Sequence, residues 1–177
     1  MRVKEFNEEV LYADEDIIKV NQQNINWLKE MSQRNRRQRI RLCTHKSIDD
    51  CLHEMLIVHR KDTYVRPHKH LNKSESFHII EGSVDVIIFN NIGEIIEVIK
   101  MGEVLSGYEF YYRISEACFH TLLIHSDFLV FHETTSGPFN REDTIFAPWT
   151  PAEEDNLAVE KFRQDLRDRI NAVVAVV

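Results

Sequence analysis

Two histidines separated by one residue, with a glutamate soon after them, constrain this chain more than any other feature. His68 and His70 lie in the segment TYVRPHKHLNKSESFHIIEG, with Glu75 five residues after His70 and Gly82 seven residues after Glu75. Residues two apart on a β-strand point to the same face, so this pair would present two imidazoles to one point. A metal ion is the simplest ligand for such a pair. A glutamate on the neighbouring strand would add an oxygen donor.

A further donor is expected from a later strand. If residues 75–81 form a regular strand, His78 points away from Glu75 and is a poor ligand. His120, in RISEACFHTLLIH, would share its face with Leu122 and Ile124, so we expect it to point into the core. The other histidines lack partners at ligand spacing and are interpreted as structural or surface residues, namely His45, His53, His59, His125 and His132.

Three imidazoles and one carboxylate would form a borderline-to-hard metal site. The predicted ligands of one divalent transition metal are His68, His70, Glu75 and His120. Such a set suits Fe(II), Mn(II), Ni(II), Co(II) or Zn(II), and the Irving–Williams order leaves the choice open. An octahedral ion would keep positions free for a substrate or water. The alternative, two surface histidines and a solvated glutamate, requires the spacings and the turn glycine to coincide by chance.

The pattern of apolar residues predicts a mainly β fold. Short apolar runs between residues 54 and 135 are separated by turn residues at even spacing. This pattern is typical of an antiparallel β-sandwich or barrel (jelly roll), here of about eight to ten strands. Asn90, Asn91 and Gly93 supply the left-handed conformers that a hairpin needs.

Helices are expected on both sides of these strands. Asn21 can cap a short helix through INWLKEM, and Ser47 a second short helix that ends near Cys51. The segment SGPFNREDTIFAPWT is expected to be a long coil that packs back onto the sheet through Phe139, Phe146 and Trp149.

A C-terminal helix is expected to begin near Thr150 with a hydroxyl cap, Pro151 in its first turn and Glu153 at its third position. Its apolar stripe would consist of Val159, Phe162, Leu166, Ile170 and Val173. The expected organisation is a single domain over residues 1–177. It would have N-terminal strands and helices over 1–53, a metal-binding β-barrel core over 54–135, and the coil and helix over 136–177.

Composition limits location and partners. No run in the 177 residues approaches the roughly 18 apolar residues of a membrane span, and the start, MRVKEFNEEV, lacks a signal-peptide core. Three scattered cysteines, Cys43, Cys51 and Cys118, fit reduced thiols. We therefore expect a cytoplasmic protein. The net charge of −7 argues against nucleic-acid binding, and the apolar end NAVVAVV would pack on the domain or meet a second subunit, so a homodimer is expected.

Candidate substrate-binding residues are arginines. Arg36, Arg37, Arg39 and Arg41 form a basic run in an acidic chain, and Arg66 comes just before the paired histidines. Guanidinium groups bind phosphate or carboxylate with two parallel hydrogen bonds, so these residues could hold an anionic substrate. The alternative for the run is a solvated turn.

Two residues are candidates for acid–base catalysis. Tyr64 would share a face with Arg66 and His68 on a regular strand and could donate a proton. A packed aromatic side chain is the alternative. Glu133 could act as a base, or it could be a salt-bridged strand end.

The spacing of the histidines and the glutamate resembles a known motif. H-x-H, four residues, E, six residues, G is the first motif of the cupin superfamily, and it is matched without a gap change by His68, His70, Glu75 and Gly82. The second cupin motif, P-x-G-x-x-H, keeps only its histidine, His120, because Ser115 and Ala117 replace the proline and the glycine.

More narrowly, residues 22–155 resemble the WbuC-type cupin metalloproteins, through TYVRPHKH, ETTSGPFN and FAPWTPAEE. Such proteins are encoded with surface-polysaccharide genes, for O-antigen lipopolysaccharide or capsule. The resemblance implies a metal-binding cupin that acts on a sugar or sugar nucleotide in that pathway, as an isomerase, epimerase or related enzyme. The alternatives are a non-catalytic, metal-dependent sugar-binding protein and an Fe(II) dioxygenase.

Overall fold

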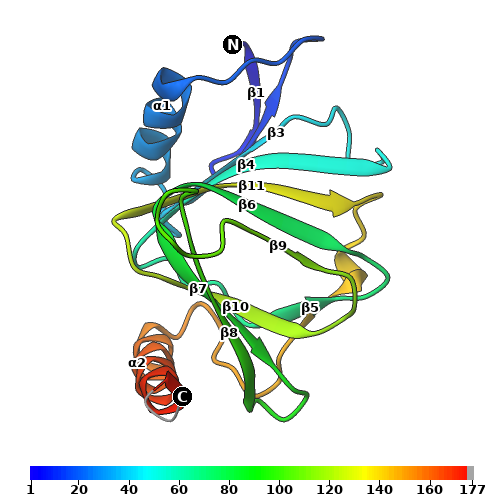
Figure 1. Ribbon diagram of the computed structural model, residues 1–177. Helices are drawn as coiled ribbons and strands as arrows, with labels where there is room; N and C mark the ends of the chain where they lie inside the picture. Colours follow the sequence, from blue (N-terminus) through cyan, green and yellow to red (C-terminus); the bar gives the residue numbers. More distant parts are fainter. Residues whose placement is uncertain (175–177) are drawn as a thin grey trace.

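The computed structural model describes residues 1–174, which form a β-sandwich with a helix at each end of the chain (Figure 1). The larger sheet has the order β1-β2-β3-β4-β11-β6-β9 and the smaller one β12-β5-β10-β7-β8. Neighbouring strands run antiparallel except β2 and β3, which are parallel. The fold predicted from the sequence, a mainly β, cupin-type sandwich, is confirmed.

The strands and helices have the following bounds. The larger sheet contains β1 Val3–Asn7, β2 Val10–Ala13, β3 Arg39–Cys43, β4 Leu52–Arg60, β6 Glu75–Glu81, β9 Tyr111–Ile114 and β11 Phe128–Ser136. The smaller sheet contains β5 His68–His70, β7 Ser83–Phe89, β8 Ile95–Gly102, β10 Phe119–Ile124 and β12 Thr144–Phe146. The helices are α1 Gln22–Ser32, α2 Asn156–Val174 and the short 3-10 helix η1 Arg141–Asp143.

The main core lies between the two sheets. On β6 the alternate residues Glu75, Phe77 and Ile79 are buried, as the period of two predicts. Phe77 packs against Phe131 of β11, with ring centroids 4.7 Å apart. The inward face of β6 therefore carries both core residues and the predicted carboxylate ligand.

The hairpin between β7 and β8 forms as its turn residues predict. Gly93 has a φ of +89°, a conformation that favours glycine. The Asn90 side-chain oxygen accepts hydrogen bonds from the backbone amides of Ile92 and Glu94. This turn reverses the chain, so that β8 pairs antiparallel with β7, the strand just before it.

Helix α1 covers the outer face of the larger sheet. Asn21 caps it as expected, because its side chain accepts a hydrogen bond from the Asn24 amide and the Asn24 side chain accepts one from the Asn21 amide. Ile25 and Leu28 are buried in a second core cluster on that face. The helix thus buries the sheet face that points away from the sandwich interior.

The prediction of a short helix from Ser47 to Cys51 is wrong, because these residues form turns. The Asp50 carboxylate accepts hydrogen bonds from the backbone amides of Lys46 and Ser47. Such local bonds between side chain and backbone compete with helix formation.

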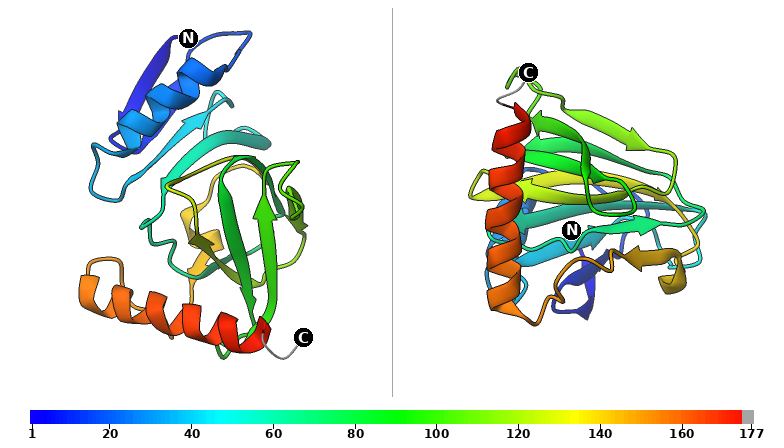
Figure 2. Two further views of the ribbon diagram at one scale, coloured as in Figure 1. Left: turned by 60° about the vertical axis from the view of Figure 1, so that its left-hand side comes forward. Right: turned by 90° about the horizontal axis from the view of Figure 1, so that it is seen from below.

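The C-terminal helix starts at Asn156, later than expected. The Thr150 hydroxyl donates to the Ala147 carbonyl at 2.7 Å, so it does not cap the helix, whereas the Asp155 carboxylate accepts from the Ala158 amide. Figure 2 shows α2 lying across the smaller sheet. Two residues of the expected stripe, Leu166 and Ile170, are buried there against that sheet, and Phe162 packs beside them. Val159 is also buried. The expectation for the apolar end NAVVAVV falls partly on residues 175–177, which lie outside the described residues.

The segment between β11 and α2 is more ordered than the expected coil. It contains η1 and β12, and β12 pairs with β5. Trp149 packs on Phe89, with ring centroids 5.0 Å apart, as expected of an anchor. Phe139 and Phe146 instead remain 51% and 48% exposed.

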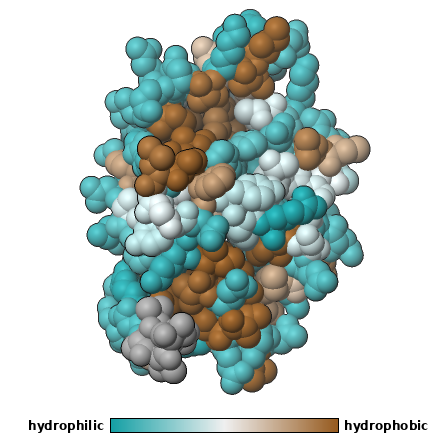
Figure 3. Space-filling model, in the orientation of Figure 1, coloured by the Kyte–Doolittle hydropathy of each residue, from teal (hydrophilic) through white to brown (hydrophobic). Residues whose placement is uncertain are grey.

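Surface hydropathy is uneven. Figure 3 shows apolar side chains gathered in two areas, one on the upper half of the molecule and one on the lower half, over the region of β7 and β8. Ile96 on β8 and Ile92 in the preceding turn are exposed. Within residues 1–174, neither α-helix has the length and hydropathy of a membrane span.

Candidate metal centre

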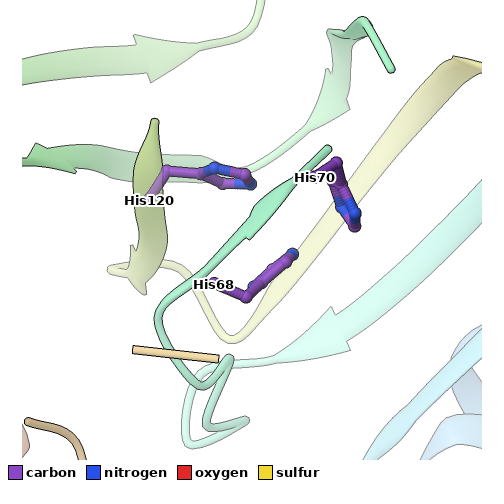
Figure 4. Close-up of side chains that lie close together, drawn as sticks. All are labelled: His68, His70 and His120. Carbon is purple, nitrogen blue, oxygen red and sulfur yellow. The ribbon is translucent and has the colours of Figure 1, made fainter. Parts of the chain in front are cut away.

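Three imidazoles converge inside the sandwich (Figure 4). His68 and His70 come from β5, and His120 comes from β10, where it lies directly opposite His68 in the register. One ring nitrogen from each histidine lies within 4.8 Å of the others. The structure thus brings together the histidines that strand alternation singled out, and this triad could hold a metal ion.

Glu75 faces the triad from the other sheet. Its Oε1 lies 2.8 Å from His120 Nε2, and its Oε2 lies 3.4 Å from His70 Nε2. Within the described residues, Oε1 is buried and has no partner with hydrogen-bond geometry. A buried carboxylate oxygen without such a partner, beside three imidazoles, is a suitable ligand for a cation. Glu75 as the fourth ligand remains a prediction.

Hydrogen bonds orient all three rings. The Nδ1 atoms lie 2.8 Å from the Arg66 carbonyl for His68, 3.1 Å from the Thr144 hydroxyl for His70, and 3.0 Å from the Cys118 carbonyl for His120. In a neutral ring whose Nδ1–H donates to these oxygens, Nε2 keeps its lone pair for a metal. The donor set therefore fits a divalent transition ion held through three Nε2 atoms.

The β5 strand is short and depends on its neighbours. The larger part of the TYVRP segment before it has no strand pairing, although the Thr121 hydroxyl donates to the Val65 carbonyl. On one side β5 pairs with β10, and on the other it pairs with β12, which places Thr144 opposite His70. Thr144 is a site residue that sequence reasoning missed, because only the long-range pairing of β12 reveals it.

Burial and charge set the protonation of the triad. Burial, with the neighbouring His120 and His70, lowers the pKa of His68 to about 3. Burial alone would raise the pKa of Glu75, but the histidines, His120 foremost, lower it to about 2. Burial opposes a charge on His120, yet Glu75 raises its pKa above the ordinary value. A metal ligand must be deprotonated, so protons compete with the ion for His120 and metal binding is expected to weaken as pH falls.

A cavity of about 300 Å³ opens beside the triad. His70 and Thr144 form part of its wall, and Arg41 and Glu133 contribute charged groups from the larger sheet. Its walls are otherwise mostly apolar and aromatic. A small ligand in this cavity could reach both the triad and the charged groups.

The predicted arginines separate into different environments. Arg41 lines the cavity, whereas Arg36 is exposed. Arg37 and Arg39 bind Glu9, with nitrogen–oxygen distances of 3.2 Å and 2.9 Å. Their charges are therefore already partnered, and the structure places Arg41 alone of the four in the cavity wall.

Arg66 and Tyr64 lie outside the lining of the cavity. The Arg66 guanidinium donates to the Thr150 hydroxyl and stacks over the Phe146 ring. The Tyr64 hydroxyl donates to the Pro151 carbonyl at 3.3 Å, and its ring packs edge-on against Phe162. Burial raises the pKa of Tyr64 to about 12. The regular strand assumed for Tyr64 is absent, so its ring packs in the manner of the alternative interpretation.

Two histidines interpreted as structural or surface residues also line the cavity. The rings of His45 and His53 stack with centroids 4.0 Å apart, and both side chains are buried. The sequence carried no signal for this pair, because His45 lies on a turn outside the strands. The stacked pair therefore contributes aromatic surface to the cavity wall.

Glu133 lines the cavity as a half-buried carboxyl without an ion pair or hydrogen bond to another described residue. Burial and the charge of Glu75 raise its pKa to about 7, against the opposing effects of Arg41 and His120. A carboxyl with a pKa near neutrality is suited to general acid–base catalysis.

Glu133 is expected to make the metal-free protein less stable as pH rises. Its folded pKa of about 7 exceeds the ordinary 4.5, so its contribution is full below pH 4.5 and lost as pH rises to about 7. The loss should be about 1–3 kcal/mol. Urea denaturation of chelator-treated wild type and Glu133→Gln at several pH values measures it. The difference between the two proteins should change over that interval, and a constant difference would show that Glu133 has an ordinary pKa.

Comparisons with known proteins give a fold but no established activity. A family model described as "Domain of unknown function (DUF6016)" matches residues 20–101. No curated protein matches the chain. A solved structure, protein SO0799 from Shewanella oneidensis, is similar with a TM-score of 0.53 and 14% identity, covering 73% of this chain and 84% of that one.

Further solved structures share part of the fold. The capsular polysaccharide assembling protein CapF from Staphylococcus aureus is 18% identical, with a TM-score of 0.45, over 55% of this chain and 27% of that one. The cupin domain of Schizosaccharomyces pombe Cnp3 is 12% identical, with a TM-score of 0.44, over 56% of this chain and 64% of that one.

Proposed function

We propose that this protein is a metal-dependent enzyme that acts on a sugar or sugar nucleotide of surface-polysaccharide (O-antigen or capsule) biosynthesis. The observation that carries the metal dependence is the convergence of three imidazoles on one point, with a cavity beside it. The sugar pathway is supported by the resemblance of the TYVRPHKH, ETTSGPFN and FAPWTPAEE segments to WbuC-type proteins.

The residues of the site would divide the work. His68, His70 and His120 would hold the ion, with Glu75 as the fourth ligand. A bound divalent ion supplies a Lewis acid that polarises a substrate oxygen. Glu133 faces the same cavity with a pKa near neutrality and would move a proton to or from the substrate. Arg41 would hold an anionic group.

A non-catalytic, metal-dependent sugar-binding protein is the second candidate. The placement of Tyr64 favours this candidate, because Tyr64 lies outside the cavity lining. Of the two acid–base candidates, only Glu133 then lines the cavity. In that case Glu133 would affect the protonation of the bound ligand but would not catalyse a reaction.

A paired screen separates the two functions. Metal-loaded protein is incubated with nucleotide-activated sugars and free sugars, and products are followed by mass spectrometry and NMR while thermal shifts are measured on the same compounds. An enzyme is expected to form product with at least one compound, and Glu133→Gln should slow that reaction about 100-fold or more. Stabilisation without product would identify a binding protein, and neither effect with any compound would contradict the proposed substrate class.

A further inference from the structure

Arg41 lies in unusual surroundings for a cation. Arg41 of β3 pairs with Ile57 of β4, and Ile57 pairs in turn with Phe131 of β11. Ile57 and Phe131 are both core residues. Among residues 1–174, no carboxylate oxygen lies within ion-pair distance of the Arg41 guanidinium, which donates a weak hydrogen bond to the Met55 sulfur at 4.0 Å. Arg41 is half-buried, and its guanidinium is available to an anionic ligand that enters the cavity.

The charges that line the cavity point the same way. Arg41 and Lys73 are cations, and Lys73 lies over the Phe139 ring at 5.4 Å from its centroid. Glu133 is the acidic residue of the lining, and it faces the triad side because its strand, β11, lies between β4 and β6. The lining therefore carries two cations to one acidic residue, which favours an anionic ligand.

The rest of the lining offers carbon surface and few hydrogen-bond partners. The apolar and aromatic residues of the wall are Phe6, Val10, Tyr12, Ile48, Met55 and Phe139. A sugar with many hydroxyls would lose hydrogen bonds to water here without regaining them. The volume of about 300 Å³ is at the small end of ligand pockets. A nucleotide diphosphate would bring more negative charge and more bulk than one free arginine can accept.

We infer that the cavity binds a small carboxylate with an apolar body, whose carboxylate is held by Arg41 and whose other end faces the histidine triad. The inference rests on the proposed metal function for the position of the reacting end. It departs from that proposal in the substrate, which would be a small organic acid and not a sugar or sugar nucleotide. A planar or ring-shaped body would pack against the stacked His45 and His53 rings.

The test uses the full chain loaded with Mn(II) or Zn(II). Benzoate and cyclohexanecarboxylate serve as probes, and benzamide, glucose and UDP-glucose serve as matched controls, with affinities measured by isothermal titration calorimetry. The carboxylates should bind more tightly than all controls, and Arg41→Met should weaken them at least tenfold. Arg36→Met, which alters an exposed arginine of the same basic run, should leave the affinities unchanged.

Further measurements separate this inference from the metal proposal. Arg41→Lys keeps the charge but loses the planar fork, so it should bind carboxylates with intermediate affinity, and it replaces Arg41→Met if that variant does not fold. Metal content is measured on each protein. Equal carboxylate affinity in wild type and the Arg41 variants, or tighter binding of UDP-glucose, would overturn the inference while leaving a metal-loaded site intact. Absence of bound metal in the wild type would instead contradict the proposed function.

Discussion

Replacing either His70 or His120 with alanine is expected to remove most of the metal that the wild-type protein carries. Each change deletes one of the three nitrogens that converge within 4.8 Å. The two remaining imidazoles and Glu75 would hold a divalent ion far more weakly, because affinity depends on ligand number and geometry. Elemental analysis should find about one ion per wild-type chain and less than about a tenth of that in either variant, as expected for a site of this type.

His78→Ala is the matched control for this experiment. His78 lies on β6, three residues after Glu75, but its side chain is exposed. The variant should keep the full metal content. Metal retained by both the His70 and His120 variants would show that the triad is not the binding site, and loss of metal in His78→Ala would point to a general effect of histidine removal.

Gly82→Ala is expected to destabilise the fold by about 2–5 kcal/mol. Gly82 has a φ of +94°, which costs an L-residue about 1–2 kcal/mol. A methyl group there would also overlap the Phe128 carbonyl oxygen and the Ser126 hydroxyl, which adds about 1–3 kcal/mol of overpacking. Thermal unfolding should show a lower melting temperature, by roughly 5–15 °C for a domain of this size.

Gly107→Ala separates the two contributions. Gly107 has a similar φ of +80°, but no atom lies within 4 Å of the position that a methyl group would take. This variant should lose only the conformational part, about 1–2 kcal/mol. Equal losses in the two variants would show that crowding at Gly82 is unimportant.

The convergence of the three histidines was predictable because the relevant signal is local. Alternation along β10 places His120 on the inner face without knowledge of its partner strands, and the same rule excludes His78. Thr144 and the role of Arg41 were not predictable in this way. The position of Thr144 depends on the pairing of β12 with β5. The availability of Arg41 depends on which of the neighbouring arginines form ion pairs with Glu9.

The element boundaries were harder to predict where side chains can bond locally. Thr150 reads as a helix cap in the sequence, but its hydroxyl is already bonded to the Ala147 carbonyl. Ser47 begins a turn because the nearby Asp50 carboxylate captures backbone amides. In both places a short-range hydrogen bond, invisible in the hydropathy pattern, decided the structure.

The pairing of β5 has a consequence for the order in which this protein matures. The strand that carries His68 and His70 is flanked by β10 and by β12, both of which follow it in the chain. A ribosome-bound chain that has emerged only as far as β11 would lack one flank of that strand and the hydroxyl that orients the His70 ring. Ion capture should therefore come late in synthesis, after residues 144–146 have been translated and have paired.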